Sequence, residues 1–236
     1  MAEPPPRKKR VKPANYDIFA AAEYKIFRET AAGKEHNQPV RQFLDSLRGR
    51  RWGFVTYRTV PGPDAEAQVQ AAIAKLNAVV KKEVEGNLSD AELDRSVNEK
   101  VWARWRGAMV EVMGNEEEPV GIDEVRAVFL EMTRGGDVGG RGMRDVCILL
   151  DKEGAKRLID ADVNGEERLV SNGGTYVAVV DGSWVSGEGD PEYPGWMKVN
   201  VRSLMRLFDV LGTMSLNDNW SILSERDKDG VFIYEG

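Results

Sequence analysis

An unbroken apolar run, Val-Cys-Ile-Leu-Leu at residues 146–150, is the strongest structural signal in the chain. A strand with one face in water alternates apolar and polar residues, so this run predicts a strand buried on both faces. Residues 52–60 and 176–180 have the composition of two further strands, and we expect them to lie beside it. A right-handed crossover would make strand 52–60 parallel to strand 146–150.

Helical spacing of apolar residues predicts the elements that cover this sheet. Apolar residues recur every third or fourth position in residues 65–85, 93–109, 122–132 and 202–211. A further strand is predicted at 196–201, and a hairpin over residues 220–235. This order favours an α+β fold, in which a mixed sheet of four to five strands carries helices mainly on one face. It is compatible with an elaborated ferredoxin-like sandwich.

Charge divides the chain into an arm and a body. Residues 1–50 hold 11 Lys and Arg against 6 Asp and Glu, whereas the whole chain of 236 residues has a formal net charge of −6. The body is therefore acidic and repels phosphate backbones at long range. We expect a disordered basic arm at 1–15, a helical N-terminal extension at 16–49 and a single α+β domain at 50–236.

Closely spaced basic residues dominate the arm. They are Arg7, Lys8, Lys9, Arg10 and Lys12. A nuclear import receptor binds an extended run of this kind, so the arm is typical of a one-part nuclear localisation signal and predicts a nuclear protein. The alternative is a solubilising or polyanion-binding tail, which would leave the protein in the cytoplasm.

An aromatic segment follows the arm. Its aromatic residues recur at helical spacing and predict an amphipathic helix that docks on the body or binds an unknown protein partner. They are Tyr16, Phe19, Tyr24 and Phe27. Apolar runs elsewhere are far shorter than the roughly 20 residues of a membrane span, so we expect no membrane contact.

Nucleic acid is an alternative partner. It could contact the basic arm together with a group of arginines near Trp52. These arginines are Arg48, Arg50, Arg51 and Arg58. Solvated arginines at a strand edge are the competing interpretation. Trp102 and Trp105 could likewise form a stacking surface, but their helical spacing within an apolar stripe favours a place in the core.

Candidate catalytic groups are few. The one histidine, His36, lies in a polar stretch, and the one cysteine, Cys147, lies within the predicted buried strand. We therefore assign no catalytic residue and no cofactor. The glycine-rich loop at 135–142 lacks the Gly-Lys-Ser/Thr ending of a phosphate-binding loop, so we interpret it as a connector.

Asp151 and Asp181 each come at the end of an apolar strand. If neighbouring strands are parallel, both carboxylates would reach one edge of the sheet and could hold a divalent metal for hydrolysis or phosphoryl transfer. Helix capping by Asp151 and a tight turn at Asp181 are the alternative.

Four short motifs occur in order along the body. They are RWGFVTYR at residues 51–58, VCILLD at 146–151, VVDGSW at 179–184 and GWMKV at 195–199. Over residues 50–212 they resemble a family of uncharacterised proteins abundant in filamentous fungi, although Thr56 stands where that family would carry a larger aliphatic residue. The resemblance implies a fungal origin and transfers no activity, cofactor or catalytic residue. We expect a non-enzymatic nuclear protein-interaction module, with a metal-dependent enzyme or a nucleic-acid binder as alternatives.

Overall fold

The computed structural model describes residues 38–60, 64–86, 95–111, 120–134, 142–164, 174–188, 191–218, 224–226 and 231–234. The chain divides into two units after His36, and all of these residues belong to the second, Asn37–Gly236. Helix α2, Gln38–Leu47, belongs to this unit, although the sequence pattern assigns it to the N-terminal extension. The basic arm and the aromatic segment at 16–27 lie outside the described residues.

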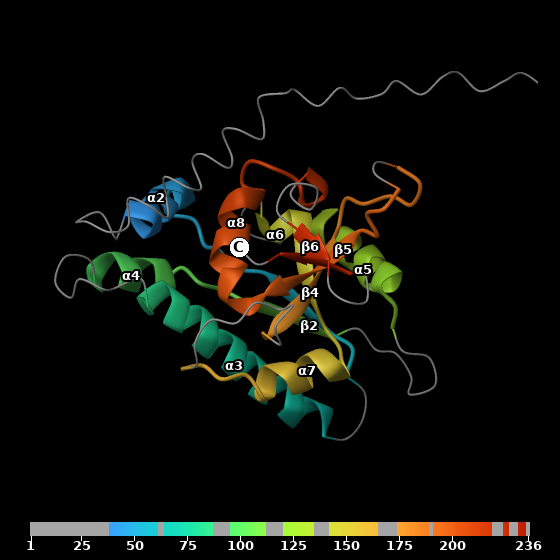
Figure 1. Cartoon of the computed structure of the whole chain (residues 1–236), viewed down its shortest axis with the longest axis horizontal. Helices are drawn as coiled ribbons and strands as arrows, with labels where there is room; N and C mark the ends of the chain where they lie inside the picture. Colours follow the sequence, from blue (N-terminus) through green and yellow to red (C-terminus); the bar gives the residue numbers. More distant parts are fainter. Residues whose placement is uncertain are drawn as a thin grey trace, which may run out of the picture. The chain divides into compact units, whose positions relative to one another are not determined.

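A mixed sheet lies at the centre of this unit (Figure 1). The strand order among the described residues is β2-β1-β3-β4-β5-β7-β6. The strands are β1 Val55–Arg58, β2 Ala108–Glu111, β3 Val146–Leu150, β4 Tyr176–Asp181, β5 Trp196–Asn200, β6 Ser224–Arg226 and β7 Phe232–Tyr234. The predicted α+β class with a mixed sheet is confirmed. Strands β1 to β5 form a five-stranded body, and the terminal hairpin β6-β7 extends it at the edge of β5.

Strand direction changes in the middle of the sheet. β1 is parallel to both β2 and β3, as the predicted crossover requires for β3, whereas β4 is antiparallel to both of its neighbours, β3 and β5. β7 is parallel to β5. β1 pairs directly with two parallel strands, β2 and β3. A split β-α-β unit has an antiparallel strand between its two parallel strands, so the described strands do not have the order of a ferredoxin-like sandwich.

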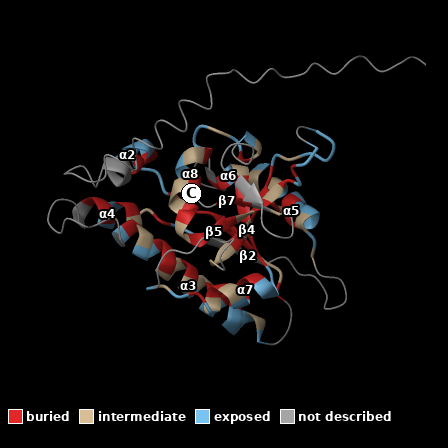
Figure 2. Ribbon diagram, in the orientation of Figure 1, coloured by how far each residue is buried: buried red, intermediate tan, exposed pale blue. Residues whose placement is uncertain are grey.

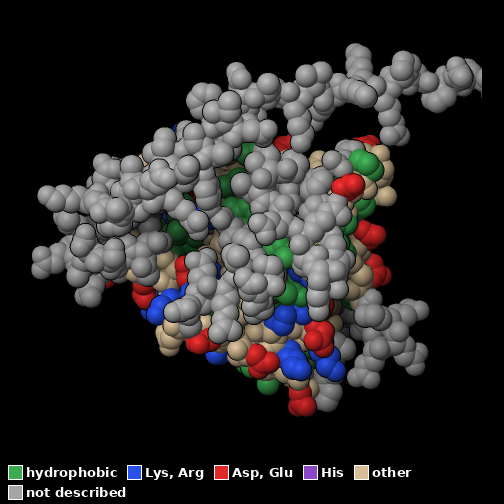
Figure 3. All heavy atoms as spheres, viewed as in Figure 1, with side chains coloured by type: hydrophobic (Ala, Val, Ile, Leu, Met, Phe, Trp, Pro, Cys, Tyr) green, Lys and Arg blue, Asp and Glu red, His purple; other side chains and the backbone are tan. Residues whose placement is uncertain are grey.

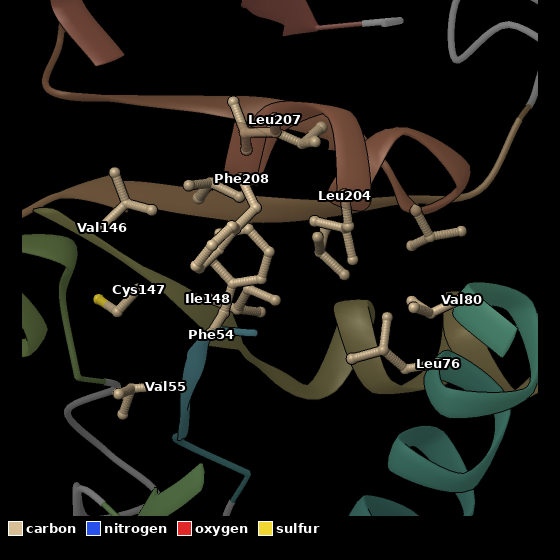
Figure 4. Close-up of a cluster of buried hydrophobic side chains, with 14 of the residues drawn as sticks. Phe54, Val55, Leu76, Val80, Val146, Cys147, Ile148, Leu204, Leu207 and Phe208 are labelled. Atoms are coloured by element: carbon tan, nitrogen blue, oxygen red, sulfur yellow. The ribbon is translucent and has the colours of Figure 1, made fainter. Parts of the chain in front are cut away.

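The central strand β3 is enclosed on both faces. All five of its residues are buried, as the apolar run predicts, and the buried positions of the unit gather on the strands (Figure 2). Ile148 points toward Phe54, Leu204 and Phe208, whereas Cys147 points to the opposite side of the sheet (Figure 4). One face of β3 therefore meets helices α3 and α8, and the other needs a separate cover.

Helices supply both covers. They are α3 Ala65–Gly86, α4 Arg95–Trp102, α5 Ile122–Arg134, α6 Gly142–Asp145, α7 Lys152–Ile159 and α8 Leu204–Leu211. α3 and α8 cover the Ile148 face, and α7 lies along α3 (Figure 1). α5 covers the opposite face, where the rings of Tyr57 and Phe129 meet edge to face at 6.1 Å. Among the described helices, none has the length and apolar composition of a membrane span.

The predicted long helix over residues 93–109 is wrong in its second half. α4 ends at Trp102, and the chain then runs alongside Trp52 into β2. The Trp52 amide donates to the Arg104 carbonyl at 3.0 Å, and the Arg106 amide donates to the Trp52 carbonyl at 2.8 Å. These bonds replace the helical ones. The apolar positions beyond Trp102 that continue the helical period lie instead in a turn and in β2. Over so short a stretch, periodicity alone does not distinguish a helix from a strand.

Gly53 permits this close crossing of two backbones. Its φ is +139°, a conformation that side-chain-bearing residues rarely adopt, and a Cβ there would lie 1.9 Å from the Arg106 carbonyl oxygen. Gly107 lies in the second of the two crossing segments, and its surroundings are more open. A Cβ at Gly107 would lie 4.0 Å from the Phe54 carbonyl oxygen, an ordinary van der Waals distance.

We predict that Gly53→Ala lowers the free energy of unfolding by about 3 kcal/mol or more, because the added methyl group collides with backbone. The matched control, Gly107→Ala, is expected to change it by less than about 1 kcal/mol. Urea unfolding followed by circular dichroism measures both. Similar stabilities for the two variants would show that the segments around Gly53 and Arg106 do not cross in this way.

Candidate functional site

The two aspartates considered as metal ligands lie at opposite ends of β3. Asp181 pairs with Val146, the first residue of β3, whereas Asp151 follows the last one. The predicted shared carboxylate site is therefore wrong, because it required β3 and β4 to be parallel and they are antiparallel. Within the described ranges, no group of three or more His, Cys, Asp or Glu side chains is placed to hold a metal ion.

Each aspartate has a local structural role instead. Asp151 is the N-cap of α7, and its side chain accepts a hydrogen bond from the Gly154 amide at 2.6 Å. Asp181 closes a turn, because its Oδ1 accepts from both the amide and the hydroxyl of Ser183 at 2.8 Å. The cap and the turn that the sequence offered as alternatives are both present.

The arginines considered for nucleic-acid contact do not form one cluster. Arg48, Arg50 and Arg51 are exposed and precede β1, whereas Arg58 ends β1 and forms an ion pair with Glu66. Trp52 is fully buried, and its indole N–H donates to the Val101 carbonyl at 2.8 Å, so it offers no surface for a base. On the face shown in Figure 3, basic and acidic side chains of the described surface are interspersed.

Cys147 is not placed to act as a nucleophile. It is fully buried on the α5 side of the sheet, and this burial raises the pKa of its thiol well above the ordinary value. A thiol needs a lowered pKa and access to solvent to react. His36 and the import-signal residues lie outside the described residues.

A buried polar network connects α5 to the loop between β4 and β5. Arg126 of α5 is 6 % exposed, and its guanidinium donates to the carbonyls of Asp181 at 2.9 Å and Gly195 at 3.1 Å. It also pairs with the Asp123 carboxylate and lies 4.5 Å from the centre of the Trp184 ring. The charge of Arg126 is thus compensated on every side, as a buried charge requires.

The Asp181 carboxylate completes this network. Besides Ser183, it accepts a hydrogen bond from the Tyr193 hydroxyl at 3.1 Å. Gly195 has a φ of +79°, and a Cβ there would lie 2.4 Å from the Trp184 ring. The VVDGSW and GWMKV motifs therefore have a structural explanation: they hold the β4–β5 loop on α5.

A cavity of about 460 Å³ lies on the opposite face of the sheet, between α3 and the segment that joins α4 to β2. Its walls are mostly apolar: Phe54, Ile73, Leu76, Trp102, Trp105 and Ile148. Thr56, Asn77 and Arg106 add polar groups to the lining, and Ala103 and Gly107 complete it. We call this the tryptophan cavity. Its size lies within the range of known ligand pockets, about 300–1,000 Å³.

The two tryptophans have defined positions in this wall. Trp105 is 7 % exposed, Trp102 is half-buried, and their rings are nearly parallel, at 14° with centroids 6.4 Å apart. The Trp105 indole N–H donates to the Asn77 side-chain oxygen at 2.8 Å. The sequence offered core packing and a stacking surface as alternatives for this pair. The structure places both residues against the core and also in the cavity wall.

Sequence reasoning did not single out Asn77 or Arg106, and it considered Thr56 only as a departure from the pattern of the fungal family. The sequence holds one usable signal, the cluster Trp-Ala-Arg-Trp-Arg-Gly at residues 102–107. Helical periodicity predicts that this cluster lies inside a long helix, whereas the structure has it between α4 and β2. Asn77 and Thr56 carry no local signal, because only the fold brings them to this segment.

Comparisons with known proteins add no relative from which a function could be transferred. The chain matches no model of a known protein family, no curated protein and no solved structure. The resemblance to a family of filamentous fungi therefore stays a prediction.

The Tyr193 hydroxyl allows a test of the buried network. Burial, followed by the negative charge of Asp181 and the hydrogen bond to it, raises the pKa of Tyr193 above its ordinary value of 10.0. The folded protein therefore holds this proton more tightly than the unfolded chain does. Its contribution to stability is fully present below pH 10 and is lost as the pH rises above that value.

We predict that Tyr193→Phe lowers the free energy of unfolding at pH 8 by about 1.5–3 kcal/mol, because the Asp181 carboxylate loses a buried donor. Above pH 10 the variant should lose stability less steeply than the wild type, by up to about 1.4 kcal/mol per pH unit. Urea unfolding at pH 8 and at pH 10–11 measures both effects. Tyr176→Phe, at a half-buried ring outside the network, is the control at pH 8. An equal loss in the two variants would contradict the network.

Proposed function

We propose that the protein is a nuclear protein-interaction module, and that its tryptophan cavity receives a side chain of the partner. The cavity is the observation that carries this proposal. It combines a mostly apolar wall, two tryptophans and a few polar groups, which is the usual composition of a binding pocket. Among the described residues, Val185 is the one exposed large hydrophobic side chain. A single such residue does not make an apolar surface patch, so the cavity is the better candidate for a binding site.

The engagement of the other polar groups supports binding over chemistry. Asp151 caps a helix, Asp181 and Tyr193 bond to each other, and Cys147 is sealed in the core. Each of these groups has a structural partner or a buried site that explains its presence. The cavity, by contrast, has no evident structural purpose, because an unfilled space of this size forfeits packing contacts.

The position of the cavity at the sheet edge favours a protein segment as the occupant. The segment that lines it, from Trp105 to Gly107, runs directly into β2. Among the described strands, β2 has β1 as its one neighbour. An extended segment of a partner can pair with such an edge through main-chain hydrogen bonds, while a side-chain pocket beside the edge provides specificity.

The basic arm supports a nuclear location. We predict that residues 1–15 fused to a fluorescent reporter carry it into the nucleus, because a run of five basic residues fits the groove of an import receptor. The matched control changes Arg7, Lys8, Lys9, Arg10 and Lys12 to Gln and should leave the reporter distributed through the cell. Equal distribution of both reporters, measured as the ratio of nuclear to cytoplasmic fluorescence, would contradict the nuclear assignment.

A second prediction concerns the cavity. Ala103→Trp adds a bulky ring to the cavity wall and should reduce co-precipitation of the partner by the full-length protein about tenfold or more, because the ring occupies the partner's place. Quantitative mass spectrometry of proteins captured from fungal nuclei measures this. Ala127→Trp, at an exposed alanine of α5 on the opposite face of the sheet, is the control. If every captured protein is recovered equally with both variants, the cavity is not the binding site.

A further inference from the structure

We infer that the tryptophan cavity selects an aromatic side chain flanked by acidic residues. This inference rests on the proposed function, because it names the chemistry of the segment that the cavity binds. Two features of the lining carry it: the wall is predominantly aromatic and aliphatic, and its polar groups include the positive charge of Arg106 and the amide of Asn77, which can donate hydrogen bonds.

The wall favours an aromatic occupant. Phe54, Trp102 and Trp105 contribute three aromatic rings to the lining, and the two indoles are nearly parallel. Ile73 and Leu76 of α3 and Ile148 of β3 contribute aliphatic surface. A planar ring gains both apolar burial and favourable ring–ring contact in such a space, whereas an aliphatic side chain gains burial alone.

The polar part of the lining offers hydrogen-bond donors. The Asn77 side-chain oxygen already accepts from the Trp105 indole at 2.8 Å, so the donor half of this amide remains for an occupant. Arg106 is exposed at the rim, and one of its guanidinium nitrogens donates to the Trp105 carbonyl at 2.8 Å, which holds the group beside the cavity. Donors of this kind match carbonyl and carboxylate oxygens.

The charges near the cavity have the sign that suits an acidic segment. Among the described residues that line the cavity, Arg106 is the one with a charged side chain, and none is Asp or Glu. Lys81 adds a second positive charge, because its Nζ lies 5.9 Å from the centre of the Trp102 ring. Glu85, one turn further along α3, lies 3.7 Å from the same ammonium group and partly offsets it. The wall thus presents local positive charge on an otherwise acidic body.

The test uses the full chain and four synthetic peptides in isothermal titration calorimetry. Three are seven residues long and differ only beside a central tryptophan: acetyl-Thr-Val-Xaa-Trp-Xaa-Val-Thr-amide, with Xaa as Glu, Gln or Lys. In the fourth, the tryptophan of the Glu peptide is replaced by alanine. We expect the Glu peptide to bind about threefold to fivefold more tightly than the Gln peptide, the range of partly exposed charge pairs. The Lys peptide should bind more weakly still, and the alanine peptide at least about tenfold more weakly than the Glu peptide.

Two arginine variants separate the rim charge from charge in general. Arg106→Gln should abolish most of the preference for Glu over Gln. Arg104→Gln should leave it intact, because Arg104 lies two residues away, does not line the cavity and donates in the same manner, to the Lys100 carbonyl at 2.9 Å. The preference should also shrink in 0.5 M salt, which screens charges at the rim.

The outcomes distinguish this inference from the proposed function. Equal affinities for the Glu, Gln and Lys peptides, all weakened by Ala103→Trp, would overturn the acidic preference and leave the cavity as a binding site. An alanine peptide that binds as tightly as its tryptophan counterpart would overturn the aromatic preference. Absence of binding by all four peptides, or binding that Ala103→Trp does not weaken, would count against the cavity itself. Circular dichroism of each variant confirms that it is folded.

Discussion

The enclosure of β3 on both faces is the constraint on which the rest of the structure depends. A fully buried Val, Ile or Leu side chain contributes about 1.5–3 kcal/mol, but a strand with no polar face can use this only if each side of the sheet is covered. Ile148 meets α3 and α8 on one side, and Cys147 faces the α5 side (Figure 4). The positions of α3, α5 and α8 against the sheet follow from that need.

On the α5 side, the β4–β5 loop places backbone carbonyl groups in the interior, and these groups need hydrogen-bond donors. The buried guanidinium of Arg126 donates hydrogen bonds to the carbonyls of Asp181 and Gly195 in this loop. A buried charge left without partners would be strongly destabilising, so the network is effective only when complete. Tyr193 and Ser183 complete it around the Asp181 carboxylate. These contacts give the Asp-Gly-Ser-Trp turn at residues 181–184 a structural role and require no catalytic one.

On the opposite face of the sheet the packing leaves a cavity, and the binding proposal rests on that cavity. α4 stops at Trp102, and the chain crosses to the sheet edge so that its backbone can pair with Trp52. The space bounded by this crossing, α3 and the strands is the tryptophan cavity. Its rim carries Arg106, and β2 begins one residue beyond Gly107. The same local break therefore places a pocket, a cation and a strand edge next to one another.

The features that depend on short-range chemistry could be predicted from the amino-acid sequence. The unbroken run of β3, the apolar stripes of α3 and α5 and the cap at Asp151 are all set by residues within a few positions of one another. The parallel pairing of β1 with β3 agrees with the predicted crossover, in which the helices between two strands return the chain to the same end of the sheet. Two features are visible only in the folded protein: β4 runs antiparallel to β3, which separates Asp151 from Asp181, and α4 ends early, at Trp102. The fold also brings Asn77 to Trp105 and Thr56 into the same cavity. Strand pairing and helix ends depend on contacts between distant residues, and local periodicity contains no record of which distant residues will meet.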